Sequence, residues 1–244
     1  MSRLAAGILV VLLGALPARS IAGAGVPADA AAPRASVALS TTSTGGVDGV
    51  LARVQSVEDR VRDVTLTFRQ TTLLKATGDS GSTTGTLALM RSPERFRVTF
   101  TAPVEQIALY DGTYLWLYLP AAAQAYRQKA GPQELARVLG LNPAEPVRSF
   151  RRGYRASLAG CDGRGCTVDF ARGGSSPMTW HVRVSATTWR MDEAWFENDE
   201  VKVSLSCYDY RVNRKLTAGD FRLALPRDVE IQDGIPMMFG AKTP

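Results

Sequence analysis

Residues 85–120 read GTLALMRSPERFRVTFTAPVEQIALYDGTYLWLYLP, and this stretch decides the fold class. Apolar and aromatic residues alternate with polar ones, which is the period-two pattern of half-buried strands. An Asp-Gly pair between two such runs is a strong signal for a two-residue hairpin turn, here at Asp111-Gly112. The pattern predicts four antiparallel strands, over 85–91, 95–101, 105–110 and 113–119.

Similar patterns continue on both sides of this stretch. Upstream, residues 64–69 alternate as a strand, a Gly/Ser/Asp/Thr loop covers 77–84, and apolar residues of 47–62 recur at helical spacing. Downstream we predict a short helix over 132–141, with Pro132 at its start and Gly140 near its end. Further strands are predicted near 123–129 and at 149–158, 165–172, 178–186, 189–197, 200–211 and 220–231.

These elements add up to one mainly β domain over 47–244, with an antiparallel sheet of roughly 11 strands. A sheet of this length twists and curls rather than staying flat, so we expect an incomplete β-barrel. Two helices are available to cover its apolar face. Period alone leaves open whether the inside is a packed core or a hydrophobic cavity.

The N-terminal segment resembles a secretory signal peptide. Residues 1–24 place Arg3 before an apolar run that ends near Leu16, and Ala22-Gly23-Ala24 forms an A-x-A-like cleavage site. We therefore predict export of the chain, with cleavage near Ala24. The Ala-, Ser-, Thr-, Gly- and Pro-rich residues 25–46 are predicted to be a disordered N-terminal stretch.

Composition narrows the classes of function. The chain has 244 residues and a single histidine, His181, which tells against His-based metal sites and Ser-His-Asp or Cys-His catalysis. The formal charge of +6 suggests an anionic partner, but an exported protein is not expected to bind nucleic acid. We expect no catalysis, no cofactor and no metal.

Three cysteines follow the predicted signal peptide. Cys161 and Cys166 enclose a Gly-rich turn, and in an oxidising compartment this spacing favours a disulfide over half of a metal site. Cys207 lies within a predicted strand and is interpreted as a small buried apolar side chain.

Several motifs follow one another in an order that is typical of a known protein family. A Gly-x-Leu strand is followed by a basic residue and Pro93 before the aromatic strand of Phe96, which Pro103 closes. The Asp-Gly turn and an aromatic strand with Trp116 and Tyr118 come next. Together with Phe68-Arg69-Gln70 upstream and the residues 216–223 downstream, this resembles the outer-membrane lipoprotein carrier family, the LolA proteins of the bacterial periplasm.

The resemblance covers roughly 47–233 and implies a half-barrel with a helical lid over a hydrophobic cavity. In that family the cavity shields the acyl chains of lipoproteins crossing the periplasm. Cargo comes from an ATP-driven transporter in the inner membrane and passes to a receptor at the outer membrane. We accordingly expect a monomeric periplasmic carrier of acylated lipoproteins or a related lipid.

The resemblance implies that apolar residues on one face of the predicted sheet and helix line the cavity. The family has Arg directly before the Pro that precedes the aromatic strand, whereas here Ser92 holds that place and Arg91 stands one position earlier. We predict that Arg91 takes part in lid closure and cargo handover. The candidate lining comprises Leu51, Val54, Leu66, Phe68, Leu87, Leu89, Phe96, Val98, Phe100, Ile107, Leu109, Leu115 and Leu117.

Two other classes of function stay open. A periplasmic lipid-sensing or regulatory binding module can share the same fold. A hydrolase would need a carboxylate pair, and Glu193, Glu197, Asp199 and Glu200 gather near a predicted turn, where acidic residues ordinarily serve solubility.

Overall fold

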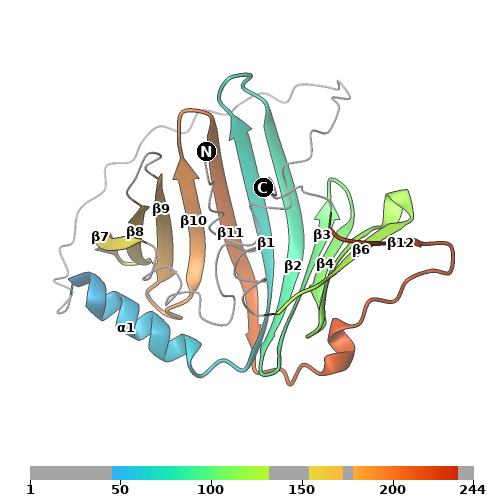
Figure 1. Ribbon diagram of the computed structural model, residues 1–244. Helices are drawn as coiled ribbons and strands as arrows, with labels where there is room; N and C mark the ends of the chain where they lie inside the picture. The colour runs from blue at the N-terminus through green and yellow to red at the C-terminus, as the bar shows by residue number, and fades with distance from the viewer. Residues whose placement is uncertain (1–45, 132–153, 173–177, 236–244) are drawn as a thin grey trace.

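The computed structural model describes residues 46–131, 154–172 and 178–235 (Figure 1). The predicted signal peptide, most of the stretch 25–46 and the predicted helix 132–141 lie outside these residues. The helices are α1 (Gly46–Glu58) and the short 3₁₀ turns η1 (Pro120–Ala122) and η2 (Ala218–Phe221). The strands are β1 (Asp63–Leu74), β2 (Ser80–Arg91), β3 (Glu94–Ala102), β4 (Gln106–Tyr110), β5 (Tyr114–Leu119), β6 (Gln124–Lys129), β7 (Arg155–Asp162), β8 (Gly165–Arg172), β9 (Met178–Ser185), β10 (Met191–Glu197), β11 (Val201–Val212) and β12 (Glu230–Asp233).

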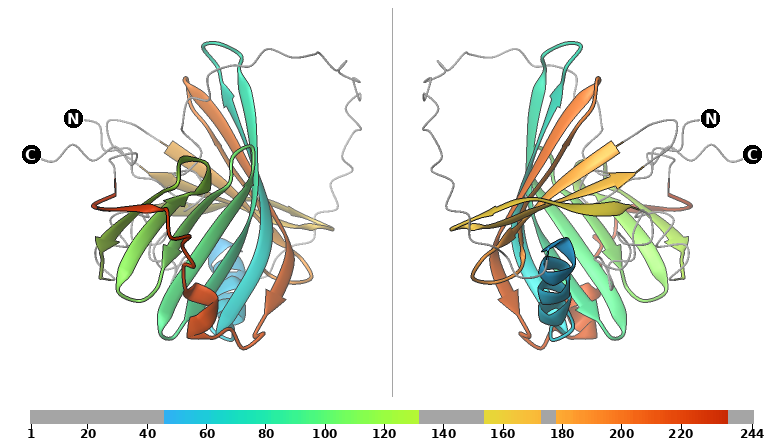
Figure 2. Two further views of the ribbon diagram at one scale, coloured as in Figure 1. Left: turned by 90° about the vertical axis from the view of Figure 1, so that its right-hand side faces the viewer. Right: turned by 90° about the vertical axis from the view of Figure 1, so that its left-hand side faces the viewer.

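All 12 strands belong to one sheet, in the order β12-β6-β5-β4-β3-β2-β1-β11-β10-β9-β8-β7. The sheet curls strongly and does not close, because β12 and β7 remain as its two edges (Figures 1 and 2). Neighbours pair antiparallel except β12, which runs parallel to β6. The prediction of a mainly β fold built on one large, curled, open sheet is confirmed.

The hairpin β1–β2 is longer than predicted. Residues 80–84, expected in a loop, continue β2 and pair with the end of β1, where Thr71 faces Ser82 and Leu73 faces Ser80. The turn is confined to 75–79, and Gly78 adopts the left-handed φ of 74° that it needs. Thr and Ser fit an exposed, pleated surface, so a polar sequence did not mean a loop here.

Helix α1 ends four residues before the predicted boundary. After Glu58 the backbone tightens, with Val61 N–H donating to the Glu58 carbonyl. Asn213 then binds the emerging chain: its Oδ1 accepts from Arg62 N–H at 2.8 Å and its Nδ2 donates to the Arg60 carbonyl at 3.1 Å. A contact from the far end of the chain thus fixes this boundary.

The predicted strand 220–231 is wrong. Thr217 and Asp220 form a capping box, in which Thr217 N–H donates to Asp220 Oδ2 at 2.7 Å, and this box starts η2 instead. The chain then runs across the sheet without pairing until β12 begins at Glu230. The alternating Leu223 and Leu225 pack on the outer face of the sheet rather than forming a strand.

The turn between β4 and β5 contains three residues, not the two predicted. Asp111 organises it, because its Oδ1 accepts from the N–H groups of Thr113 and Tyr114, both at 2.8 Å. Its Oδ2 accepts from the indole N–H of Trp116 at 2.9 Å. Gly112 supplies a positive φ of 101°.

Candidate functional site

The inner face of the sheet carries a continuous apolar cluster. On β1 to β5 its rows follow the strand register, so that Leu66 faces Leu87 and Leu87 faces Val98. Nine of the predicted lining residues belong to the cluster and two pack against it. These are Leu51, Val54, Leu66, Phe68, Phe96, Val98, Phe100, Leu115 and Leu117, with Leu87 and Leu89 at its margin.

Aromatic packing fills the middle of this inner face. The rings of Phe68 and Phe100 meet edge to face with centroids 5.6 Å apart. Gly85 lies between them on β2, and a Cβ there would stand 2.7 Å from the Phe68 ring. Phe68, Phe96 and Val98 have no exposed surface, so a ligand enters this face only when side chains or covering elements move aside.

Ile107 and Leu109 lie on the opposite face of the sheet. They form a second cluster with Tyr118 and Ala125, packed under Leu223, Leu225 and Val229. The register explains the placement, because Ile107 faces Tyr118 and Leu109 faces Trp116, whereas Ala108 faces Leu117. The predicted two-residue turn would likewise have paired residues 107 and 109 with even-numbered residues of the next strand. The placement of Ile107 and Leu109 on the face opposite to Leu115 and Leu117 could therefore have been predicted from the hairpin.

The second half of the lining was not predicted from the sequence. Strands β8 to β11 contribute buried side chains to the same cluster, including Val168, Phe170, Trp180, Val182, Ala194, Phe196, Val203 and Leu205. The rings of Trp180 and Phe196 are 4.4 Å apart. The period-two alternation of these strands predicts a buried face, but they contain no family motif, so their residues were not assigned to the lining.

Helix α1 joins the cluster through Val50, Leu51 and Val54. Its C-terminal residue, Glu58, interacts electrostatically with Arg91 at the end of β2. Burial raises the pKa of Glu58 to about 7, although the positive charge of Arg91 acts in the opposite direction. The structure thus brings Arg91 to the end of α1.

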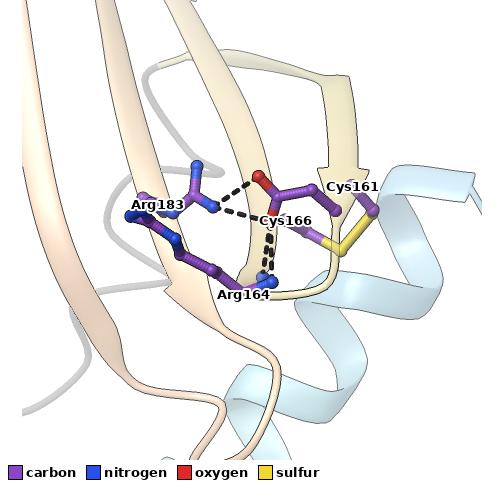
Figure 3. Close-up of a disulfide and its surroundings, with 6 residues drawn as sticks. Cys161, Arg164, Cys166 and Arg183 are labelled. Atoms are coloured by element: carbon purple, nitrogen blue, oxygen red, sulfur yellow. Dashed lines mark hydrogen bonds and ion pairs between the residues drawn. A yellow bond between two sulfur atoms is a disulfide. The ribbon is translucent and has the colours of Figure 1, made fainter. Parts of the chain in front are cut away.

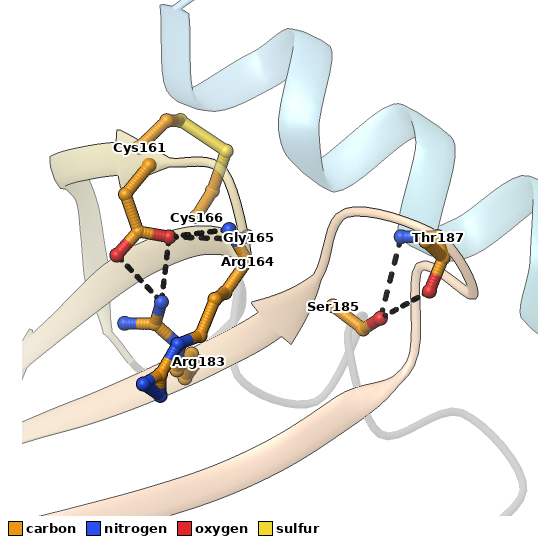
Figure 4. Close-up of polar contacts among 8 residues, drawn as sticks. Cys161, Arg164, Gly165, Cys166, Arg183, Ser185 and Thr187 are labelled. Carbon is orange, nitrogen blue, oxygen red and sulfur yellow. Dashed lines mark hydrogen bonds and ion pairs between the residues drawn. A yellow bond between two sulfur atoms is a disulfide. The ribbon is translucent and has the colours of Figure 1, made fainter. Parts of the chain in front are cut away.

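The predicted disulfide is confirmed: Cys161 and Cys166 are bonded across the β7–β8 turn, next to α1 (Figure 3). The Asp162 carboxylate accepts hydrogen bonds from the backbone N–H groups of Arg164 and Gly165 (Figure 4). Its two oxygens also accept from the guanidinium of Arg183, at 2.6 and 2.7 Å. The hydrogen bond from Arg183, followed by the two backbone bonds, lowers the pKa of Asp162 to about 2. This edge of the sheet is therefore held by covalent and polar contacts.

The remaining predicted polar residues have structural surroundings. His181 Nδ1 lies 2.7 Å from Asp169 Oδ1, and its ring stacks on Trp195 with centroids 5.2 Å apart. Cys207 is unpaired and buried, and burial raises its pKa to about 12. Within the described parts of the chain, no three His, Cys, Asp or Glu side chains are grouped to hold a metal ion.

An outer hollow of about 470 Å³ lies between the sheet and the C-terminal segment. Its wall includes Arg95, Trp116 and Phe221, and the guanidinium of Arg95 donates to the Asp111 carbonyl. This hollow is on the opposite side of the sheet from the inner cluster. In residues 46–131, 154–172 and 178–235, no helix combines the length and apolar character needed to cross a bilayer.

Comparison with known proteins agrees with the expected resemblance. The model of the family described as outer membrane lipoprotein carrier protein LolA matches residues 59–147. No curated protein matches the chain. An uncharacterized conserved protein from Thermus thermophilus shares the fold, with a TM-score of 0.51, 13% identity, and coverage of 77% of this chain and 98% of that one.

Two further solved structures are similar at lower scores. LolA superfamily protein NE2245 from Nitrosomonas europaea has 14% identity and a TM-score of 0.39, with 73% of this chain and 98% of that one covered. MucB in the Pseudomonas aeruginosa MucA/MucB complex has 10% identity and a TM-score of 0.46, covering 73% and 61%. The likeness to the LolA family therefore rests on the sequence match over residues 59–147.

Proposed function

We propose that this LolA-like chain is a periplasmic carrier that binds the acyl chains of lipoproteins, or a related lipid, against the inner face of its curled sheet. One observation carries the proposal. The apolar lining runs without interruption from β5 through β1 to β8 and includes one face of α1. It extends on both sides of the residues 59–147 that match the family model.

Burial alone supplies the energy for such a carrier. Each methylene group removed from water contributes roughly 0.8 kcal/mol, so one long acyl chain contributes on the order of ten kcal/mol before the opposing terms are subtracted. No covalent step is needed to load the cargo. Release instead needs a better acceptor or a change in the protein that exposes the lining.

Helix α1 is the proposed movable cover. It contributes Val50, Leu51 and Val54 to the cluster. Its contacts with the sheet are made by side chains, including Glu58 near Arg91, rather than by strand pairing. Arg53 lies over the Trp189 ring at 4.8 Å, beyond the end of β9. Lifting α1 would expose the apolar rows beneath it while the sheet stays intact.

The proposed cargo places the chain between two membranes. A carrier of this kind takes its cargo from an ATP-driven transporter at the inner membrane and delivers it to a receptor at the outer membrane. Arg91, which interacts with the end of α1, is the proposed handover residue. The predicted signal peptide at 1–24 fits this location.

Native mass spectrometry of the protein purified from its own periplasm tests the cargo. A bound acylated polypeptide or lipid is the expected result, and protein that carries neither would contradict a carrier. The movable cover is tested with Arg53→Cys and Trp189→Cys joined by a short crosslinker. Exchange of a fluorescent acyl lipid should slow at least tenfold and recover when a cleavable linker is cut.

The uncrosslinked double variant is the matched control, because it has lost the same two side chains. Exchange at the same rate in the crosslinked and cleaved forms would show that α1 is not the cover. The lipid-binding proposal would survive that result, since another element would then control access.

A further inference from the structure

Within the part of the chain that the structure describes, three uncharged polar side chains of the inner face have atoms without a hydrogen-bond partner. They are Gln70 Oε1 on β1, Gln106 Oε1 on β4 and the indole Nε1 of Trp180 on β9. The three residues are 3%, 8% and 1% exposed, so bulk water does not reach them. We call Gln70, Gln106 and Trp180 the interior polar belt.

Register places the belt along a line that crosses the sheet obliquely. Trp180 connects through β10 and β11 to Thr72 on β1, two residues from Gln70. Gln106 connects through β3 and β2 to Phe68, two residues away on the other side. Trp180 and Gln106 are each three strands from Gln70, roughly 14 Å along the sheet surface, so the belt spans the sheet from β9 to β4.

The rows next to the belt on the α1 side are apolar. One of them joins Leu66, Leu87, Val98, Ala108 and Leu117. The belt thus borders apolar rows of the inner face. An acyl chain with a polar linkage at its end has the same division.

Unpaired polar atoms in such a place are costly. A buried donor or acceptor without a partner loses the hydrogen bonds that it makes to water, and such groups are ordinarily bound by protein, water or ligand. Gln70 Nε2 makes one long hydrogen bond, 3.4 Å to Thr72 Oγ1. Turning the amide over would satisfy its oxygen and leave its nitrogen without a partner.

We propose that the interior polar belt binds the polar linkage of an acylated ligand, which makes the site selective for ester- or amide-linked chains. This rests on the proposed lipid-binding function. The Trp180 indole N–H donates to the carbonyl oxygen of the linkage. The amides of Gln70 and Gln106 bind a neighbouring carbonyl or N–H, while the hydrocarbon lies along the apolar rows toward α1.

A matched pair of lipids tests this selectivity. A diacyl phosphatidylglycerol has two ester carbonyls, and its dialkyl ether analogue of equal chain length has none. Competition of each against a fluorescent acyl probe should show that the full chain prefers the ester lipid about 3- to 10-fold, the range of one or two neutral hydrogen bonds. Trp180→Phe keeps an aromatic ring but removes the N–H, so the preference should fall by most of that factor.

The other belt members and a control extend the test. Gln70→Leu and Gln106→Leu should each reduce the ester preference, leaving affinity for the ether lipid unchanged or improved. Trp195→Phe is the control, because Trp195 lies on the outer face and stacks on His181. It should keep the full ester preference.

The outcomes separate the two proposals. Equal binding of both lipids by the unaltered chain would overturn the belt's role and leave the carrier proposal standing. An ester preference that survives all three belt substitutions would do the same. Binding of neither lipid would overturn the lipid-binding function itself, and the selectivity with it.

Discussion

The two halves of the sheet contribute similarly to the interior but are built in different ways. Strands β1 to β5 carry the family motifs and are held by aromatic packing around Gly85. In the other half, strands β7 to β10, the β7–β8 hairpin at the edge of the sheet is fixed by the Cys161–Cys166 disulfide and the Asp162–Arg183 ion pair. The difference teaches that the lining is a property of the whole sheet, whereas the recognisable sequence lies in one half of it.

A pair of glycines, one in each half, gives the most direct test. A Cβ on Gly85 would collide with the Thr99 carbonyl oxygen, and one on Gly165 with the Val184 carbonyl oxygen. Both neighbours are backbone and cannot turn away. We expect Gly85→Ala and Gly165→Ala each to lower the free energy of unfolding by about 2–3 kcal/mol, measured by urea denaturation.

Gly160→Ala is the matched control, because nothing lies within 4 Å of a Cβ at that position on β7. It should change the free energy of unfolding by less than about 0.5 kcal/mol. If Gly165→Ala proved as mild as this control, the β8–β9 contact would not be as close as the structure has it. A loss in one half alone would also show that the halves unfold separately.

Removing the disulfide tests the contribution of the β7–β8 hairpin alone. The bond closes a loop of only six residues, so its loss should cost about 2 kcal/mol by the loop-entropy argument. We expect the paired change Cys161→Ala with Cys166→Ala to increase amide hydrogen exchange in β7 and β8, because β7 is an edge strand. The β1–β2 hairpin should keep its protection.

Cys207→Ala on β11, the strand between β1 and β10, provides a comparison that leaves the disulfide intact. It removes one buried sulfur atom without opening a crosslink. Uniform acceleration of exchange across β1 to β5 in the disulfide variant would contradict a local role for the bond. It would mean that the edge hairpin stabilises the entire sheet.

The alternation of apolar and polar residues predicted the inner face of β1 to β3 well, but it did not predict the faces of β4. Alternation placed Leu66, Phe68 and Val98 on one face, because strands with a single buried face reveal it directly. Strand β4 is buried on both faces, so alternation could not tell Ile107 from Ala108. Only the pairing of β4 with β5 distinguishes them.

Long-range contacts account for most of the remaining errors. The end of α1 depends on Asn213, which is about 150 residues away in sequence, and β12 depends on parallel pairing with β6. The belt residues were not predicted because their significance lies in the absence of partners. No sequence pattern reports that a buried Gln106 has an unbound oxygen.

The smallest expected effect concerns the junction of α1 with the first half. Burial raises the pKa of Glu58 from 4.5 to about 7, so the folded chain keeps a proton that the unfolded chain releases between these values. Stability should therefore fall as pH rises from about 4.5 to 7, and the full loss persists above 7. Solvent screening at this half-buried site limits the loss to about 1–2 kcal/mol.

Glu58→Gln removes the titration, so it should stabilise the chain by about that amount at pH 8 and have little effect at pH 4. Urea denaturation at both pH values measures it, with Glu105→Gln, an exposed carboxyl just before β4, as the control. An equal stabilisation at pH 4 and pH 8 would contradict the burial of a charge. Because Glu58 is the last residue of α1, a penalty that grows with pH also weakens the attachment of the proposed cover. The same variant should therefore slow the exchange of acyl lipid at pH 8 more than at pH 5.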